Sequence, residues 1–164
     1  MYQYKGCGLN NIYLVNGYVE KETNYGNAVS VSKLKELHNV IGFTIITSSK
    51  AITGKEIRFL RKDLDLSIVD LSVLTMISTS YIEEIEKMDS IVENDKKLVS
   101  LINIIKLLYL NKVKNSMSYK AKIDLLFKRK RDTKNKLYFE LDKETKKWIL
   151  KNSVESLNQE GLNV

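Results

Sequence analysis

The soft metal ligands that this chain of 164 residues offers are Cys7 and the single histidine, His38. Zinc sites usually take three or four protein ligands, so these two residues are too few for one. Cys7 lies between Gly6 and Gly8 in a predicted tight turn, and His38 follows Leu37 on a predicted helix. We therefore expect both to be structural residues, with no metal and no cofactor.

Enzyme chemistry needs residue patterns that this sequence does not contain. A catalytic nucleophile needs a base and an orienting group beside it, and a phosphate loop needs closely spaced glycines before a helix. The seven glycines form no such loop, and no pair of acidic residues has a diagnostic spacing. We therefore expect no enzyme activity and look for a binding function.

The composition favours a folded protein with an anionic partner. The chain is 43% apolar, enough to bury a core, and 27 basic against 20 acidic residues give a net charge of +7. A single cysteine excludes an internal disulfide framework. There is neither an N-terminal hydrophobic signal nor an apolar run of membrane-spanning length, so we expect a cytoplasmic protein without a membrane partner.

The stretch 53–86 predicts three short helices joined by two tight connections. Three capping signals begin these helices: Thr53 with Glu56, Ser67 with Asp70, and Ser78. The second and third helices are separated only by Thr75, Met76 and Ile77. They share the apolar positions Leu71, Leu74, Ile77, Ile82 and Ile85. This pattern is typical of a helix-turn-helix.

The same stretch resembles the Cro and lambda-repressor (Xre-like) class of helix-turn-helix regulators, at Leu66, Ser67, Leu71, Ile77, Ser78, Ile82 and Glu86. The surroundings are similar to a stand-alone bacterial subfamily related to the HigA and MqsA antitoxin regulators, at Tyr4–Leu9, Asn16-Gly17, Tyr25-Gly26, Leu37-His38, Thr53-Gly54 and Ile57–Lys62. The resemblance covers roughly two thirds of the chain. It implies a homodimer that binds double-stranded DNA and represses transcription, and it implies no enzyme activity.

The chain departs from that family where such a motif meets DNA. Ile68 replaces the usual Gln, Met76 replaces the turn Gly, and the third helix carries Glu83 and Glu84. A left-handed residue with a Cβ costs about 1–2 kcal/mol. Carboxylates accept from cytosine amino groups but repel phosphates. The alternative function is therefore a protein-interaction module with a degenerate helix-turn-helix that binds a toxin or another regulator.

If the third helix reads bases, its contacts are expected from Thr79, Ser80, Tyr81 and Glu83. Residues 53–111 carry 8 basic and 10 acidic groups, whereas residues 112–151 carry 14 and 5. Phosphate contacts should then come from two basic groups, Arg58, Arg61 and Lys62, and Lys128, Arg129, Lys130 and Arg131. The second group is equally well interpreted as a solvated face, and RNA binding through it is a third, weaker possibility.

The segment Leu98–Leu110 is apolar on most of its circumference, apart from Ser100, Asn103 and Lys106. A helix of this length spans about 20 Å, less than the roughly 30 Å of bilayer hydrocarbon. It should therefore be buried on two sides, against its own domain and against a second copy. The residues predicted for that dimer interface are Leu101, Ile104, Ile105 and Leu108.

The flanking segments complete an α+β, mainly α fold: a central five-helix-type helix-turn-helix domain with a small N-terminal antiparallel sheet plus helix and a C-terminal β-hairpin. Asn16-Gly17 predicts a hairpin between strands 12–15 and 18–20, with a third strand at 28–31. Ser32 is expected to cap a helix from Lys33 to Ile46, and a further helix should begin at Tyr119. The expected divisions are 1–50, the N-terminal strands and helix; 51–113, the helix-turn-helix domain; 114–151, the basic helix and hairpin of strands 137–141 and 148–150; and 152–164, a flexible tail.

Overall fold

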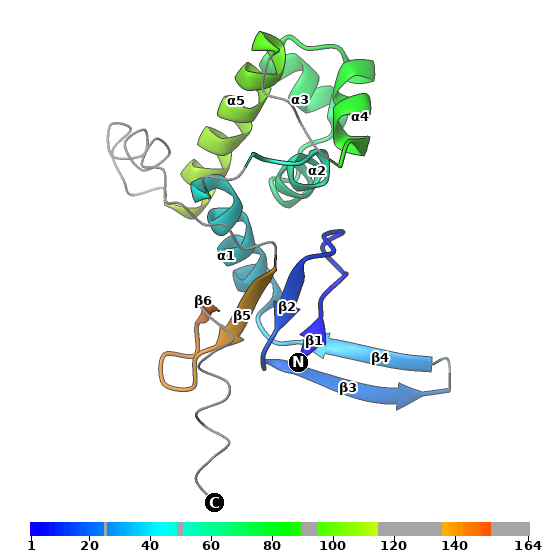
Figure 1. Ribbon diagram of the computed structural model, residues 1–164, viewed down its shortest axis with the longest axis vertical. Coiled ribbons are helices and arrows are strands. Elements are labelled where there is room, and N and C mark those ends of the chain that lie inside the picture. The colour runs from blue at the N-terminus through cyan, green and yellow to red at the C-terminus, as the bar shows by residue number, and fades with distance from the viewer. Residues whose placement is uncertain (25, 49–50, 90–94, 115–135, 152–164) are drawn as a thin grey trace, which may run out of the picture. The chain divides into compact units, whose positions relative to one another are not determined.

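The structure is a computed structural model that describes residues 1–24, 26–48, 51–89, 95–114 and 136–151 (Figure 1). Within these residues the fold is α+β, as predicted, with five helices and two small sheets. The helices are α1 (Leu34–Thr47), α2 (Gly54–Asp63), α3 (Ile68–Thr75), α4 (Thr79–Lys87) and α5 (Lys96–Val113). The strands are β1 (Tyr2–Gln3), β2 (Ile12–Leu14), β3 (Tyr18–Thr23), β4 (Gly26–Val31), β5 (Leu137–Leu141) and β6 (Trp148–Lys151).

The chain divides into two compact units. Among the described residues, unit 1 contains 1–6, 10–24, 26–40 and 136–151, and unit 2 contains 7–9, 41–48, 51–89 and 95–114. The expected divisions 1–50 and 114–151 therefore share one unit for much of their length. The helix expected from Tyr119, the basic run 128–131 and the tail 152–164 lie outside the described residues.

Unit 1 is built on a four-stranded sheet in the order β1-β2-β5-β6. β2 pairs with β5 in parallel, with Leu14 opposite Phe139. The predicted C-terminal hairpin is confirmed, since β5 and β6 are antiparallel with Leu141 opposite Trp148. Ile12, Leu14, Phe139 and Trp148 are buried, so strands from the two ends of the sequence share one core.

The predicted hairpin around Asn16-Gly17 is wrong. β2 pairs with β1 and β5, whereas β3 pairs with β4 in a separate two-stranded sheet. The Asn16 side chain accepts from the Leu141 amide at 2.6 Å and donates to the Leu141 carbonyl at 3.2 Å. Gly17 has φ +74°, and a Cβ there would lie 2.6 Å from the Trp148 ring. The pair therefore forms a corner packed on β5 and β6 instead of joining two paired strands.

The helix predicted from Lys33 to Ile46 is confirmed as α1, within one residue at each end. Ser32 uses its backbone for packing in unit 1: its amide donates to the Gly17 carbonyl at 2.9 Å, and its carbonyl accepts from the Trp148 indole at 2.9 Å. In unit 2, Gly42 leaves room for the Tyr109 ring, which would lie 2.1 Å from a Cβ at that position. A helical glycine is explained here by this close approach of a neighbouring ring.

Unit 2 contains α2 to α5 around an apolar core. Both predicted capping boxes are present, Thr53 with Glu56 and Ser67 with Asp70. The side chain of Ser78 accepts from the amide at the third position of α4, as predicted. The fully buried core residues of these helices include Ile57, Leu60, Leu71, Ile82, Leu101, Ile105, Tyr109 and Leu110. Periodicity and capping together thus define these helices.

The connection between α3 and α4 is short and partly strained. Met76, at the position where glycine is usual, ends α3 in the left-handed region with φ 56° and ψ 29°. Two side chains tighten the connection: the Ser72 hydroxyl donates to the Ile77 carbonyl at 2.6 Å, and the Thr75 hydroxyl donates to the Leu71 carbonyl at 2.6 Å. These bonds offset part of the cost of the Met76 conformation.

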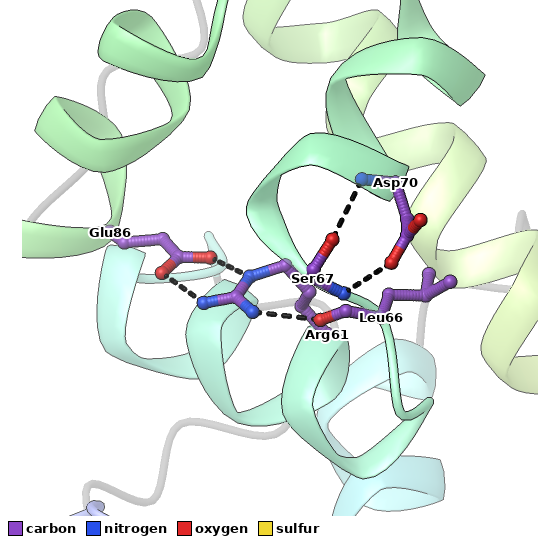
Figure 2. A network of polar contacts seen from close by, with 5 residues as sticks. All are labelled: Arg61, Leu66, Ser67, Asp70 and Glu86. Carbon is purple, nitrogen blue, oxygen red and sulfur yellow. Dashed lines mark hydrogen bonds and ion pairs between the residues drawn. The ribbon is translucent and has the colours of Figure 1, made fainter.

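A buried ion pair ties α2 to α4 (Figure 2). Arg61 Nε and Nη2 donate to the two Glu86 oxygens at 2.6 and 2.8 Å, and Arg61 Nη1 donates to the Leu66 carbonyl at 2.8 Å. Arg61 and Glu86 are each only 6% exposed. The pairing with Glu86 raises the pKa of Arg61. One guanidinium therefore connects α2, the segment before α3, and α4.

Removing one member of this pair should destabilise unit 2 strongly. Glu86→Ala leaves the Arg61 charge buried without its partner, which typically costs roughly 3–5 kcal/mol. Arg58→Ala, on the exposed side of the same helix, should change stability by less than about 0.5 kcal/mol. Urea unfolding of the two variants and the unsubstituted chain measures both values. Equal stabilities of the two variants would contradict a structural role for the pair.

Candidate nucleic-acid interface

The first turn of α4 is exposed and rich in hydroxyl groups. Ser78 caps the helix by accepting from the Tyr81 amide at 3.4 Å, and the Ser80 hydroxyl donates to the Ser78 hydroxyl at 3.3 Å. Thr79 and Ser80 are exposed. The start of a helix also carries partial positive charge from its unpaired amides. This turn can therefore donate to acceptors on an anionic ligand or on base edges.

Tyr81 is half-buried and is held by α5. Its hydroxyl donates to Asp95, whose other carboxylate oxygen caps α5 by accepting from the Lys97 amide at 2.8 Å. The hydrogen bond to Asp95 raises the pKa of Tyr81 to about 12, and the same bond lowers the pKa of Asp95. The Tyr81 hydroxyl therefore already has an acceptor within the protein, and its first role is to join α4 to α5.

The three basic residues predicted on α2 do not share one environment. Arg58 and Lys62 are exposed and available to phosphates. Arg61 is not, because its guanidinium is buried against Glu86 and the Leu66 carbonyl. The prediction of a phosphate contact at Arg61 is corrected accordingly. A sequence signal existed: Arg61 lies four residues after buried Ile57, on the same side of the helix.

The exposed charges around α3 and α4 are mostly acidic. Between Asp65 and Lys87 the exposed ionisable side chains are Asp65, Asp70, Glu83, Glu84 and Lys87. Four acidic groups and one basic group sum to −3. Glu83 is exposed, as a base contact requires, yet any DNA complex needs positive charge from elsewhere. Lys128, Arg129, Lys130 and Arg131, predicted to supply it, lie outside the described residues.

The predicted dimer residues on α5 fall into two classes. Leu101 and Ile105 are fully buried in the core of unit 2, so they have no surface left for a second copy. Ile104 and Leu108 are only half-buried. They are the part of the predicted dimer surface that remains accessible on this helix.

The residues considered for metal or nucleophile chemistry have structural surroundings. His38 Nε2 lies 2.8 Å from the Tyr4 hydroxyl within unit 1. Burial raises the pKa of the half-buried Cys7 thiol, which makes it a poorer nucleophile. No group of three or more potential metal-ligating side chains occurs in the part of the chain that the structure describes. None of the helices described there is long and apolar enough to cross a membrane.

Two contributors to this region were not recognised from the sequence. Asp95 has a recognisable local signal, an acidic residue just before an apolar helix, but its contact with Tyr81 is not local. Gly54 allows the start of α2 to approach the end of α4: its amide donates to the Met88 carbonyl at 3.0 Å, and a Cβ would lie 1.9 Å from the Ile85 carbonyl oxygen. Glycine at this position therefore sets the packing of α2 on α4.

The link between Tyr81 and Asp95 can be tested by alkaline titration. Because the bond favours the protonated phenol, its contribution to stability is complete below pH 10 and is lost as the pH approaches 12. Asp95→Asn should move one tyrosine from a pKa of about 12 toward 10. Tyrosinate absorbance measures the shift. Tyr81→Phe is the control, because adding Asp95→Asn to it should move no tyrosine; a shift there would assign the effect to another side chain.

Comparison with known proteins found no match: no family model, no curated protein and no solved structure is similar to this chain. The contacts and exposed side chains described above are therefore the basis on which its function is inferred.

Proposed function

We propose that this chain is a sequence-specific DNA-binding regulator of transcription that acts in the cytoplasm as a homodimeric repressor. In this proposal α3, the connection through Met76 and α4 act as a helix-turn-helix, and α4 enters the major groove. The observation that supports this proposal is that α4 is held at two points while its first turn stays exposed. Arg61 holds this helix at Glu86 and Asp95 holds it at Tyr81, while Thr79 and Ser80 are left exposed.

A fixed helix with an exposed first turn suits base recognition, since the N-terminal residues of a recognition helix approach the base edges. Ser80 can donate to or accept from a base, and Glu83 can accept from a cytosine amino group. Arg58 and Lys62 are the described cations on α2 that can position the phosphate backbone. The acidic groups of α3 and α4 require that the basic run 128–131 adds to this phosphate term.

A second candidate function is a protein-interaction module, with a toxin or another regulator as partner. It is favoured by one observation: α3 and its C-terminal residue expose Val69, Val73, Leu74 and Met76. Apolar groups this exposed contribute little to binding a phosphate backbone. They suit a protein partner, with or without DNA binding by α4.

DNA binding is tested by fluorescence anisotropy on the protein's own promoter and on a scrambled duplex, across a salt series. Each phosphate contact contributes roughly −0.9 to the slope of log affinity against log salt. Arg58→Ala with Lys62→Ala should flatten the slope by up to about two units on both duplexes. Neutralising residues 128–131 should act in the same way. Ser80→Ala should weaken only the promoter complex, by roughly tenfold.

The control for this series is Lys143→Ala, an exposed lysine of unit 1 in the β5–β6 turn. It should leave slope and affinity unchanged, because the proposal gives unit 1 no phosphate contact. Equal affinity of the unsubstituted protein for promoter and scrambled duplex would reject sequence-specific regulation and favour the interaction module.

The dimer is tested at Ile104, because a half-buried side chain can be changed with less damage to the core than fully buried Ile105. Ile104→Glu should convert the homodimer to a monomer that keeps its helical circular dichroism. Light scattering at tens of micromolar gives the mass. Asn103→Glu, an exposed neighbour on α5, is the control and should stay dimeric. A monomeric unsubstituted protein would refute the dimer.

A further inference from the structure

An apolar stripe runs along the outer side of α3. Val69 and Val73 follow the spacing i, i+4, which places them on one side of α3, away from buried Leu71, and Met76 follows the helix as its C-cap residue. They are 62%, 73% and 96% exposed, and Leu74 beside them is 51% exposed. Single exposed apolar residues are normal on protein surfaces. Several exposed apolar residues on one short helix and its C-cap are typical of an interaction site.

Met76 carries two costs at once. It occupies a left-handed conformation that glycine adopts without penalty, and it leaves a large apolar side chain in water. Neither cost helps the fold, because the connection between α3 and α4 would be more favourable with glycine. Both costs are explained if the Met76 side chain contacts a partner.

The charges beside the stripe indicate the chemistry of that partner. Asp65 precedes α3 and Asp70 lies in its first turn, and both side chains are exposed. Electrostatic attraction from such groups acts over about 8–10 Å at ordinary salt concentrations. The two carboxylates of this segment are unfavourable beside DNA phosphates and beside a second copy of the same segment. The segment attracts a partner that is apolar and basic.

We infer that the outer side of α3, formed by Val69, Val73 and Met76, docks a basic amphipathic helix of a partner protein. Rows of side chains at i, i+4 pack into the grooves of a facing helix, so a helix is the shape that this stripe fits. The partner helix contributes apolar side chains at its centre and Lys or Arg at its edges. This docking does not depend on base reading by α4, so the two activities can be tested separately.

The test uses the full-length protein and a fluorescent synthetic helix with leucine at i, i+3, i+4 and i+7 and lysine elsewhere. Two comparison peptides have the same leucines with glutamate in place of lysine, and the same composition in an order without an apolar face. The leucine–lysine helix should bind more tightly than both. The double variant Val73→Ser with Met76→Gly should bind the leucine–lysine helix at least about tenfold more weakly, which is about 1.4 kcal/mol.

The matched control is Val19→Ser, because Val19 is an exposed valine of β3 in unit 1. It should leave peptide affinity unchanged. Met76→Gly alone should raise the Tm of the protein while weakening its binding of the peptide, which separates loss of docking from loss of folding. Asp65→Asn should weaken binding of the lysine helix and reduce its salt dependence, whereas a purely apolar contact would not respond.

Four results would overturn the inference. One is equal binding of the ordered and reordered peptides. Another is unchanged peptide affinity in Val73→Ser with Met76→Gly. The third is a change in oligomeric state in that variant by analytical ultracentrifugation, which would assign the stripe to a second copy of this chain. The last is a matching loss of promoter affinity in the anisotropy assay, which would assign it to DNA. The Ser80→Ala result remains independent of all four.

Discussion

The arrangement of unit 2 depends on a pair of opposite charges placed where water cannot solvate them. A buried guanidinium or carboxylate is tolerated only when partners satisfy it. Arg61 meets this requirement with both Glu86 oxygens and with the Leu66 carbonyl. These directional bonds fix the distance and angle between α2 and α4 more narrowly than apolar packing alone, since apolar contacts tolerate sliding. The positions of the surface residues of α4 therefore depend on the Arg61–Glu86 pair.

The buried residues of α3 and α4 suit the stability of the fold, whereas several of their exposed residues do not. Inward residues such as Leu71, Ile82 and Ile85 are buried and consistent with the fold at every level. Outward residues include exposed valines and a methionine in a glycine conformation, which a rule based on stability alone would replace. Places where a chain breaks local rules without benefit to its own fold are where function is expected. The outer surface of α3 is such a place.

Local signals were sufficient for much of the fold. The capping boxes and the β5–β6 hairpin are each determined within a few residues, and the sequence predicted them. The hairpin predicted at Asn16-Gly17 was wrong because the strong turn tendency of this pair was overridden by bonds to Leu141, 125 residues away. The burial of Arg61 and the anchoring of Tyr81 likewise depend on Glu86 and Asp95, and neither pairing is local in the sequence. Long-range pairing explains each of these differences.

The parallel pairing of β2 with β5 has a consequence for biosynthesis. During synthesis, β2 leaves the ribosome more than a hundred residues before the strand that it needs on one side. Most of unit 2 lies between them in the sequence and contains its own core, so it can fold while unit 1 is still incomplete. Until β5 emerges, Ile12 and Leu14 lack the neighbours that bury them. The nascent chain thus passes through a stage at which one unit is finished and the other offers an unprotected strand edge to chaperones.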